Sequence, residues 1–184
     1  MAPGPELDLA RLRVRARAAY ERGRLRAAIR GAWPVAALAL LCLLADAPWT
    51  VVLPIATLHA VVVIALVHRG RAPARAVAGG WLAGSLPLLV ALASCKVPHA
   101  CAGGSCSAFC LPACLASAAV GAIALVGHAR RRRLDDPASL LAAAVIAGLT
   151  ACMGCVTIGL ASAIAALGGI ALVTAPAVLV GARR

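Results

Sequence analysis

The stretch from Gly31 to Val67 reads GAWPVAALALLCLLADAPWTVVLPIATLHAVVVIALV and holds one formally charged residue, Asp46. Over the whole chain of 184 residues, 63% are hydrophobic and the mean hydropathy is +0.96. A water-soluble domain of this length needs far more polar surface than such a composition supplies. The sequence therefore predicts an all-α integral membrane protein.

Six apolar runs along the chain predict six short membrane-spanning helices, because a span usually needs about 20 apolar residues. The expected helices cover residues 32–46, 49–67, 76–94, 106–127, 137–152 and 157–180. The first two runs are short for two crossings, but Asp46-Ala47-Pro48-Trp49 is typical of a turn at the membrane surface. We interpret the three tryptophans, Trp33, Trp49 and Trp81, as interfacial anchors. Residues 31–184 would form a polytopic helix bundle.

All 17 arginines lie outside the apolar runs. They occupy the amino-terminal tail, the second and fourth connections and the carboxyl terminus. Cytoplasmic segments of membrane proteins carry the excess of Arg and Lys, so we place both termini in the cytoplasm. The high Ala, Arg and Gly content with a single Lys is typical of GC-rich bacteria, which predicts a bacterial inner membrane. The net charge of +12 is explained by contact with lipid headgroups, and we expect no nucleic-acid binding.

Residues 1–30 form a basic tail that we expect to be helical from about Pro5. Five residues recur at helical spacing and make one apolar stripe flanked by arginines: Leu9, Leu12, Ala16, Tyr20 and Ala27. One interpretation is an amphipathic helix that lies on the inner leaflet. The other is a helix that docks an acidic cytoplasmic protein through this stripe.

A weak internal repeat relates residues 76–127 to residues 137–181. With a shift of 45 positions, Cys110 matches Cys155, and the sequence Leu-Ala-Ser-Ala recurs at 115–118 and 160–163. This pattern predicts two parallel copies of one helical hairpin, each with its inward helix beginning at an outer cysteine. The many small residues in these helices predict close backbone contacts and a compact bundle.

Seven of the eight cysteines fall in or beside the connections that we place outside the cell. The larger group contains Cys95, Cys101, Cys106, Cys110 and Cys114, and the last three share one helical face. The smaller group is the C-x-x-C of Cys152 and Cys155, expected at the start of the sixth helix. A thiol at a helix amino terminus has a stabilised thiolate, which favours oxidation or metal binding.

Three interpretations of these cysteines remain open. They form disulfides that staple the outer loops, they sense thiol-redox state, or they bind a thiophilic metal ion. In the last case the ligands would come from Cys106, Cys110, Cys114, Cys152, Cys155 and His99. An odd number of outward cysteines leaves one unpaired within a single chain, which stapling alone does not explain.

Two further residues lie within expected spans. Cys42 is most simply a small buried apolar residue. His59 is the only ionisable side chain deep in a span, and we expect it to be bonded to a neighbouring helix rather than to act in a proton relay. The sequence contains no phosphate-binding loop, no paired carboxylates within a span and no catalytic motif, so we expect no enzyme activity.

The basic tail Arg11 to Arg30, the six short spans and the outward cysteines resemble bacterial membrane anti-sigma factors of the negative regulator of sigma F type. The resemblance implies a cytoplasmic segment that holds a sigma factor and outer cysteines that sense stress. The C-x-x-C followed by a small-residue helix is also similar to mercury-uptake membrane proteins. The sequence thus predicts a regulatory membrane protein, with a thiophilic metal transporter and a structural assembly protein as the alternatives.

Overall fold

The structure is a computed structural model that describes residues 5–96, 106–131, 136–156 and 158–181. These residues form seven helices and no strand, which confirms the all-α prediction. The helices are α1 (Pro5–Gly31), α2 (Trp33–Leu44), α3 (Trp49–Arg69), α4 (Arg71–Lys96), α5 (Cys106–Arg131), α6 (Pro137–Cys155) and α7 (Leu160–Gly181).

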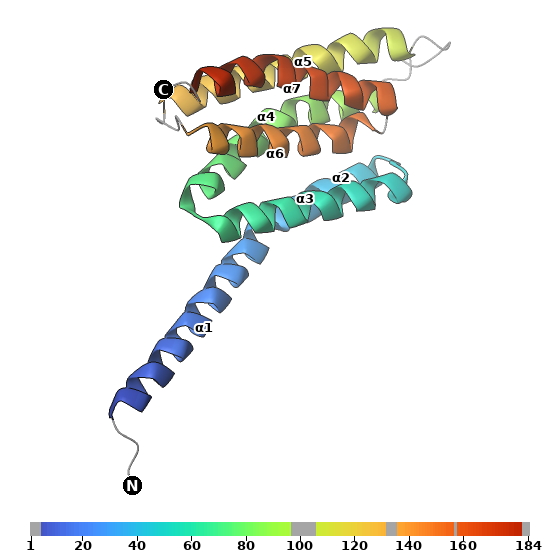
Figure 1. Cartoon of the computed structure of the whole chain (residues 1–184). Coiled ribbons are helices and arrows are strands. Elements are labelled where there is room, and N and C mark those ends of the chain that lie inside the picture. The colour runs from blue at the N-terminus through green and yellow to red at the C-terminus, as the bar shows by residue number, and fades with distance from the viewer. Residues whose placement is uncertain (1–4, 97–105, 132–135, 157, 182–184) are drawn as a thin grey trace.

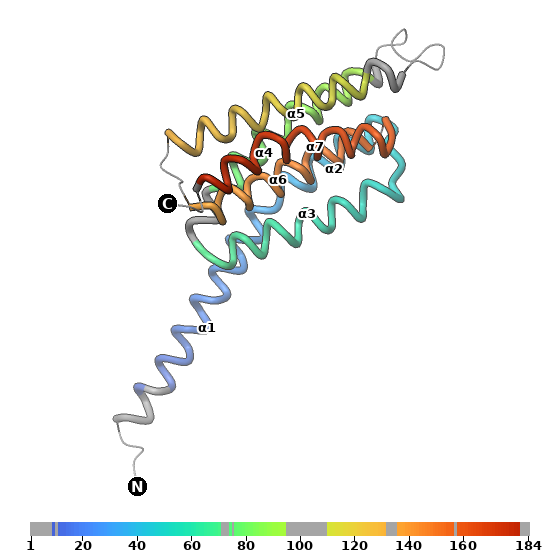
Figure 2. The backbone as a smooth tube through the Cα atoms, turned by 45° about the horizontal axis from the view of Figure 1, so that its top comes forward, coloured from blue at the N-terminus to red at the C-terminus, as the bar shows by residue number. Residues whose placement is uncertain are grey.

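The helices from α2 to α7 pack in three layers of two (Figures 1 and 2). The hairpin of α2 and α3 forms one outer layer, α4 and α6 form the middle layer, and α5 and α7 form the other outer layer. In α6, 67% of the span is buried inside the bundle, against 17% in α3. The fifth span is therefore the centre of the molecule.

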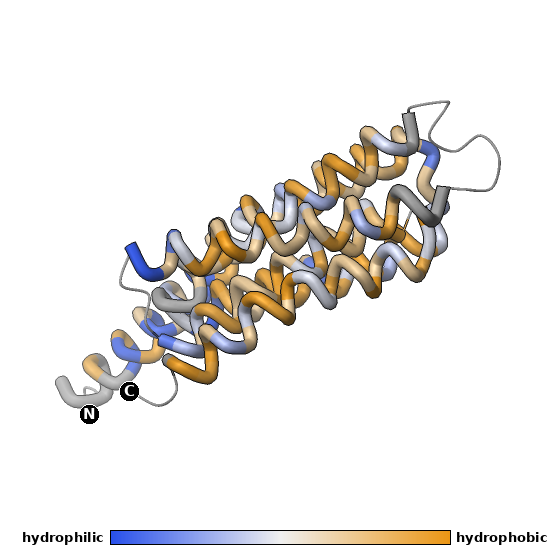
Figure 3. The backbone as a smooth tube through the Cα atoms, turned by 90° about the horizontal axis from the view of Figure 1, so that it is seen from above, coloured by the Kyte–Doolittle hydropathy of each residue, from blue (hydrophilic) through white to orange (hydrophobic). Residues whose placement is uncertain are grey.

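Within the described residues, six helices are long and apolar enough to cross a membrane, with α1 and α2 counted as one continuous segment from Arg11 to Leu44. Figure 3 shows hydrophobic residues along the bundle and the strongly hydrophilic ones mainly on α1 and near the helix ends. The largest buried cluster consists mostly of alanine, whereas large side chains such as Leu82, Leu160 and Leu172 are exposed. Soluble proteins bury such side chains, so this inverted arrangement is that of a multi-pass membrane protein in contact with lipid.

Small residues bring the central helices into backbone contact. A Cβ atom on Gly80 of α4 would lie 2.6 Å from the carbonyl oxygen of Ala143 in α6. One turn further along α4, Gly84 packs in the same way against Ala147. The two glycines form a G-x-x-x-G motif, which allows membrane helices to approach closely. The predicted compact bundle of closely packed helices is therefore confirmed in this part of the chain.

The predicted turn at Asp46 is confirmed, and its geometry explains how α2 ends. Asp46 has a φ of 64°, and the amide of Ala47 donates to the carbonyl of Cys42. This pattern is a Schellman motif, in which a residue of left-handed conformation closes the last turn of a helix. The helix itself is only 12 residues long, so α2 needs the adjoining end of α1 to cross a membrane.

The helix ends sort the connections into two groups. One end of the bundle holds the turn between α2 and α3 and the turn between α6 and α7 (Figure 1). The last turn of α4 and the first turn of α5 lie at the same end. The turn between α3 and α4 lies at the opposite end, together with the base of α1 and the end of α7. The arginine-bearing segments are thus separated from the cysteine-bearing ones by the length of the bundle.

The two hairpins of the predicted repeat, α4 with α5 and α6 with α7, pack against each other with α4 beside α6 and α5 beside α7. One detail of the prediction is wrong. Cys155 does not begin an inward helix, because it is the last residue of α6, while its counterpart Cys110 lies in the second turn of α5. The repeat itself stays a prediction.

Candidate functional site

The described cysteines gather at one end of the bundle, which we call the thiol end. They come from three helices, α2, α5 and α6: Cys42, Cys110, Cys114, Cys152 and Cys155. All are buried except Cys152, which is partly exposed. The sequence analysis set Cys42 apart from the others, because only the folded hairpin of α2 and α3 brings its end of α2 beside α6.

The last turn of α6 contacts three other helices through three consecutive residues. The thiol of Cys42 in α2 lies 3.6 Å from the carbonyl oxygen of Met153. A Cβ atom on Gly154 would lie 2.8 Å from the Cα atom of Leu88 in α4. This turn therefore joins α2, α4 and α6 at the thiol end.

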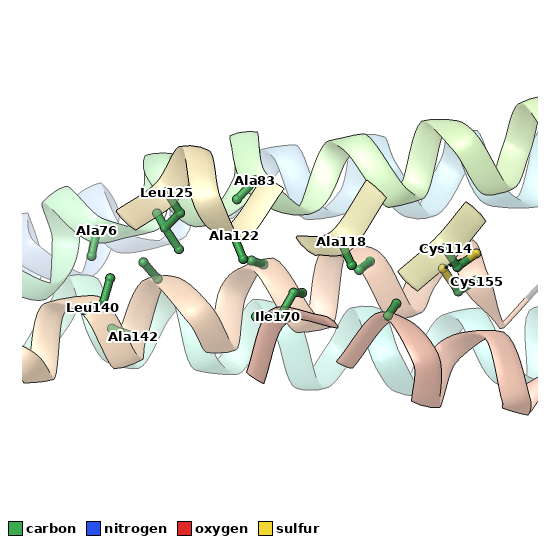
Figure 4. Packing of buried hydrophobic residues seen from close by; sticks show 14 of the residues in the cluster. Ala76, Ala83, Cys114, Ala118, Ala122, Leu125, Leu140, Ala142, Cys155 and Ile170 are labelled. Atoms are coloured by element: carbon green, nitrogen blue, oxygen red, sulfur yellow. Dashed lines mark hydrogen bonds between the residues drawn. The ribbon is translucent and has the colours of Figure 1, made fainter. Parts of the chain in front are cut away.

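The third contact joins the two cysteine groups of the sequence. The sulfur atoms of Cys155 in α6 and Cys114 in α5 are 3.3 Å apart, and both residues are fully buried (Figure 4). Figure 4 shows the two side chains pointing toward each other across the alanine-rich interface. Two thiols at this distance need a small displacement to form a disulfide, whose S–S bond is about 2.05 Å long.

The predicted position of the C-x-x-C is wrong. Cys152 and Cys155 do not open the sixth span but end the fifth, since α6 runs through Cys155 and α7 begins at Leu160. The expected activation of these thiols by a helix amino terminus therefore does not apply. The helix continues through Met153 and Gly154, which the sequence analysis placed in the connection between the fifth and sixth expected helices.

The other predicted site residues divide into two groups. Cys110 and Cys114 are buried one turn apart on the same face of α5, as the four-residue spacing predicts. Cys101 and His99 lie outside the described residues, as do the side chains of Cys95 and Cys106. Among the side chains that the structure describes, no three His, Cys, Asp or Glu lie close enough to hold a metal ion together. Among the described cysteines, the candidate site is therefore the pair of Cys114 and Cys155.

His59 is fully buried in α3 and bonded to a neighbouring helix, as expected. The indole nitrogen of Trp81 in α4 donates to its Nε2 atom at 3.2 Å. Since Nε2 accepts, the ring is neutral with its proton on Nδ1. Trp81 is partly buried and bonded inside the bundle, whereas Trp33 and Trp49 are both exposed, and the role of the tryptophans as lipid anchors stays a prediction.

The tail helix α1 begins at Pro5, where a helix start was expected, and projects away from the arginine-bearing end of the bundle (Figure 1). It is attached at its base, where Arg24 donates to the carbonyl of His68 at the end of α3 and Ala28 is buried. The predicted stripe is exposed along its length: Leu9, Leu12, Ala16, Tyr20 and Ala27.

A second apolar stripe on α1 escaped the sequence analysis. Val14, Leu25 and Ile29 recur at helical spacing on the side opposite the first stripe, and all three are exposed. Most of the arginines lie on the two sides between the stripes, whereas Arg11 and Arg30 fall on the stripes themselves. A helix that lies flat on a membrane buries one apolar face. Two opposed stripes instead suit a partner that encloses the helix.

The chain matches no known protein family, and no curated protein or solved structure is similar to it. The predictions of function therefore depend on the sequence and the geometry of this chain.

Proposed function

We propose that this protein is a membrane-embedded regulator in which the thiols of Cys114 and Cys155 sense an oxidising signal. The distance of 3.3 Å between their sulfur atoms carries the proposal. The protein would reside in the inner membrane of a bacterium with the thiol end outside, where disulfides form and persist. The tail helix α1 would then be the cytoplasmic output.

The chemistry is the oxidation of two thiols to one disulfide. The sulfurs form one S–S bond and lose two protons, and two electrons pass to an oxidant, such as the disulfide of another protein or a small molecule. The partly exposed Cys152 would meet the oxidant first and form a mixed disulfide. Its neighbour one turn away, Cys155, attacks the Cys152 sulfur and releases the oxidant's sulfur as a thiol. Cys114 then attacks the Cys155 sulfur, which frees Cys152 as a thiol and joins α6 to α5.

Bond formation would draw the last turn of α6 toward α5. Since α2 and α4 contact the same turn, through Met153 and Gly154, their packing changes with it. α6 also packs against α3, and α3 holds the base of α1 through the His68 carbonyl. A shift of α6 would thus change how α1 is presented to a cytoplasmic protein, and a sigma factor is the partner that the resemblance implies.

The test compares Cys114→Ser and Cys155→Ser with Cys42→Ser, a matched control that keeps a donor for the Met153 carbonyl. Membranes are treated with diamide, and a maleimide mass tag after denaturation counts the thiols that remain. We expect the wild type and Cys42→Ser to form a disulfide between α5 and α6 and to change the proteins that co-purify with α1. The two other variants should do neither.

The alternative signal, a thiophilic metal ion, has its own result. If mercury or silver ions changed co-purification in the wild type while diamide did not, the pair would be a metal site. Normal behaviour of both Cys114→Ser and Cys155→Ser under every challenge would overturn the sensor. A metal transporter and a structural assembly protein are the remaining proposals in that case.

A further inference from the structure

A groove of about 190 Å³ lies between α4 and α5 on the outer surface of the bundle, away from the thiol end. Its lining is apolar except for one histidine: Gly79, Leu82, Ala83, Leu86, Gly121, Ala124, Leu125 and His128. Leu82, Leu86 and Ala124 are exposed, so the groove opens toward the lipid. From His128 to Gly121 it runs about 10 Å along α5, from the arginine-bearing end to the middle of the span.

Two glycines shape this groove. A Cβ atom on Gly79 would lie 3.2 Å from the Cδ1 atom of Leu125, and one on Gly121 would meet the carbonyl of Ala83. Larger residues at these positions would fill the space or force the helices apart. The hollow is therefore set by the closely packed backbones and is not a gap between mobile side chains.

Both walls of the groove lead to an arginine at the same end. On α5, the stripe of Gly121, Ala124 and His128 continues at helical spacing to Arg131, which is exposed. On α4, the positions of Leu86, Leu82 and Gly79 continue to position 75, which is also an arginine. Asp136, a described acid at the same end, caps α6 by accepting from Ala138 and Ser139. Positive charge therefore prevails where the groove reaches the membrane surface.

We propose that this groove binds one anionic phospholipid. An acyl chain lies between Leu82, Leu86 and Ala124, and the phosphate lies at the arginine-bearing end beside Arg131 and His128. Basic clefts between membrane helices on the arginine-rich side are suited to anionic headgroups. A second copy of the chain is a poorer occupant, because pairing two such grooves side by side would bring their arginines together.

The experiment measures lipid retention by the full-length protein in detergent. The protein is titrated with phosphatidylglycerol or phosphatidylcholine, and native mass spectrometry counts the bound lipids. We expect one phosphatidylglycerol to be retained in preference to phosphatidylcholine. Arg131→Gln should weaken that preference about fivefold, because one arginine near an anionic headgroup increases the binding affinity about fivefold. Arg69→Gln, an exposed arginine at the same end on α3, is the charge control and should leave it unchanged.

The apolar part of the site is tested separately with Ala124→Leu, which fills the groove. Ala116→Leu, an exposed alanine two turns away on the same helix, is the matched control. Ala124→Leu should lose the retained lipid while Ala116→Leu keeps it, and both should stay folded by circular dichroism. Equal retention of the two lipids by the wild type, or full retention by Ala124→Leu, would overturn the site. Conversion of a dimer to a monomer by Ala124→Leu would instead assign the groove to a second copy.

Discussion

Pro87 removes one backbone donor from the middle of α4, and the carbonyl that it releases, that of Ala83, faces Gly121 of α5. A proline has no N–H, so the carbonyl four residues earlier lacks its helical partner. In lipid such a group is costly to leave unsatisfied. A Cα hydrogen of Gly121 points toward this carbonyl, because a Cβ atom in its place would collide with the oxygen. A proline in one helix and a glycine in the next thus form one structural unit.

The first prediction concerns this unit. Gly121→Ala should lower the free energy of unfolding by about 2 kcal/mol, because its methyl group would collide with the Ala83 carbonyl and force the helices apart. Gly127→Ala on the same helix has nothing within 4 Å and should be neutral or stabilising. Denaturant unfolding in detergent micelles measures both. Equal stabilities of the two variants would show that α4 and α5 do not approach each other in this way.

Single residues were predictable where the chemistry was local. A histidine in an apolar span needs a partner from another helix, and His59 has one in Trp81. Contacts between helices were not predictable in the same way. That Cys155 meets Cys114 depends on how the last turn of α6 is placed in the bundle, and Gly154 places that turn through its close contact with Leu88 of α4. Composition shows only that small residues are present.

At the scale of the helices, starting positions were easier to predict than ends. The helices α3, α5 and α6 begin at the predicted residues. The starts of α3 and α6 are marked by a Trp or a Pro that follows a polar break, and the start of α5 is marked by a cysteine. The end of α6 was missed by three residues. Cys152-Met153-Gly154-Cys155 looks like a loop because of its cysteines and glycine, yet in a packed membrane helix all four are small or flexible enough to be buried.

The second prediction distinguishes the two interpretations of α1. If a protein encloses this helix, two double variants should each reduce the amount of the co-purified partner several-fold. One combines Leu12→Ala with Tyr20→Ala, and the other combines Val14→Ala with Leu25→Ala. If the helix lies on lipid, the two pairs should differ, because only one stripe would be buried. Cross-linked partners from membranes are quantified by mass spectrometry.

The control for this experiment is a chain that lacks residues 1–30. It should insert into the membrane normally, because insertion depends on the spans, and it should lose the partner completely. Recovery of the same proteins with and without these residues would contradict the docking interpretation.

At the scale of the molecule, the core of small residues makes the helix packing sensitive to a short displacement of one helix. Lipid offers no hydrophobic driving force between helices, so the layers are held by close contacts between alanines and glycines. Such contacts tolerate little change in distance. The proposed bond between α5 and α6 would therefore be transmitted as movement of a whole helix, since the most buried helix, α6, contacts both outer layers.

The last prediction concerns orientation. In a cysteine-free chain, Pro48→Cys lies at the thiol end and Ala138→Cys at the arginine-bearing end, and both positions are exposed. A membrane-impermeant maleimide applied to intact spheroplasts should label Pro48→Cys, whereas Ala138→Cys should need permeabilisation. In the native chain, Cys152 should be labelled before Cys114 and Cys155, because only it is partly exposed among these three.

The opposite labelling pattern would have a definite consequence. If Ala138→Cys were labelled in intact spheroplasts and Pro48→Cys were not, the thiol end would face the reducing cytoplasm and α1 would face outward. Stable disulfides are rare in that compartment. The proposed sensor would then lose both its oxidising signal and its cytoplasmic partner, whereas the lipid groove would persist, because it depends on which end carries the arginines and not on which side that end faces.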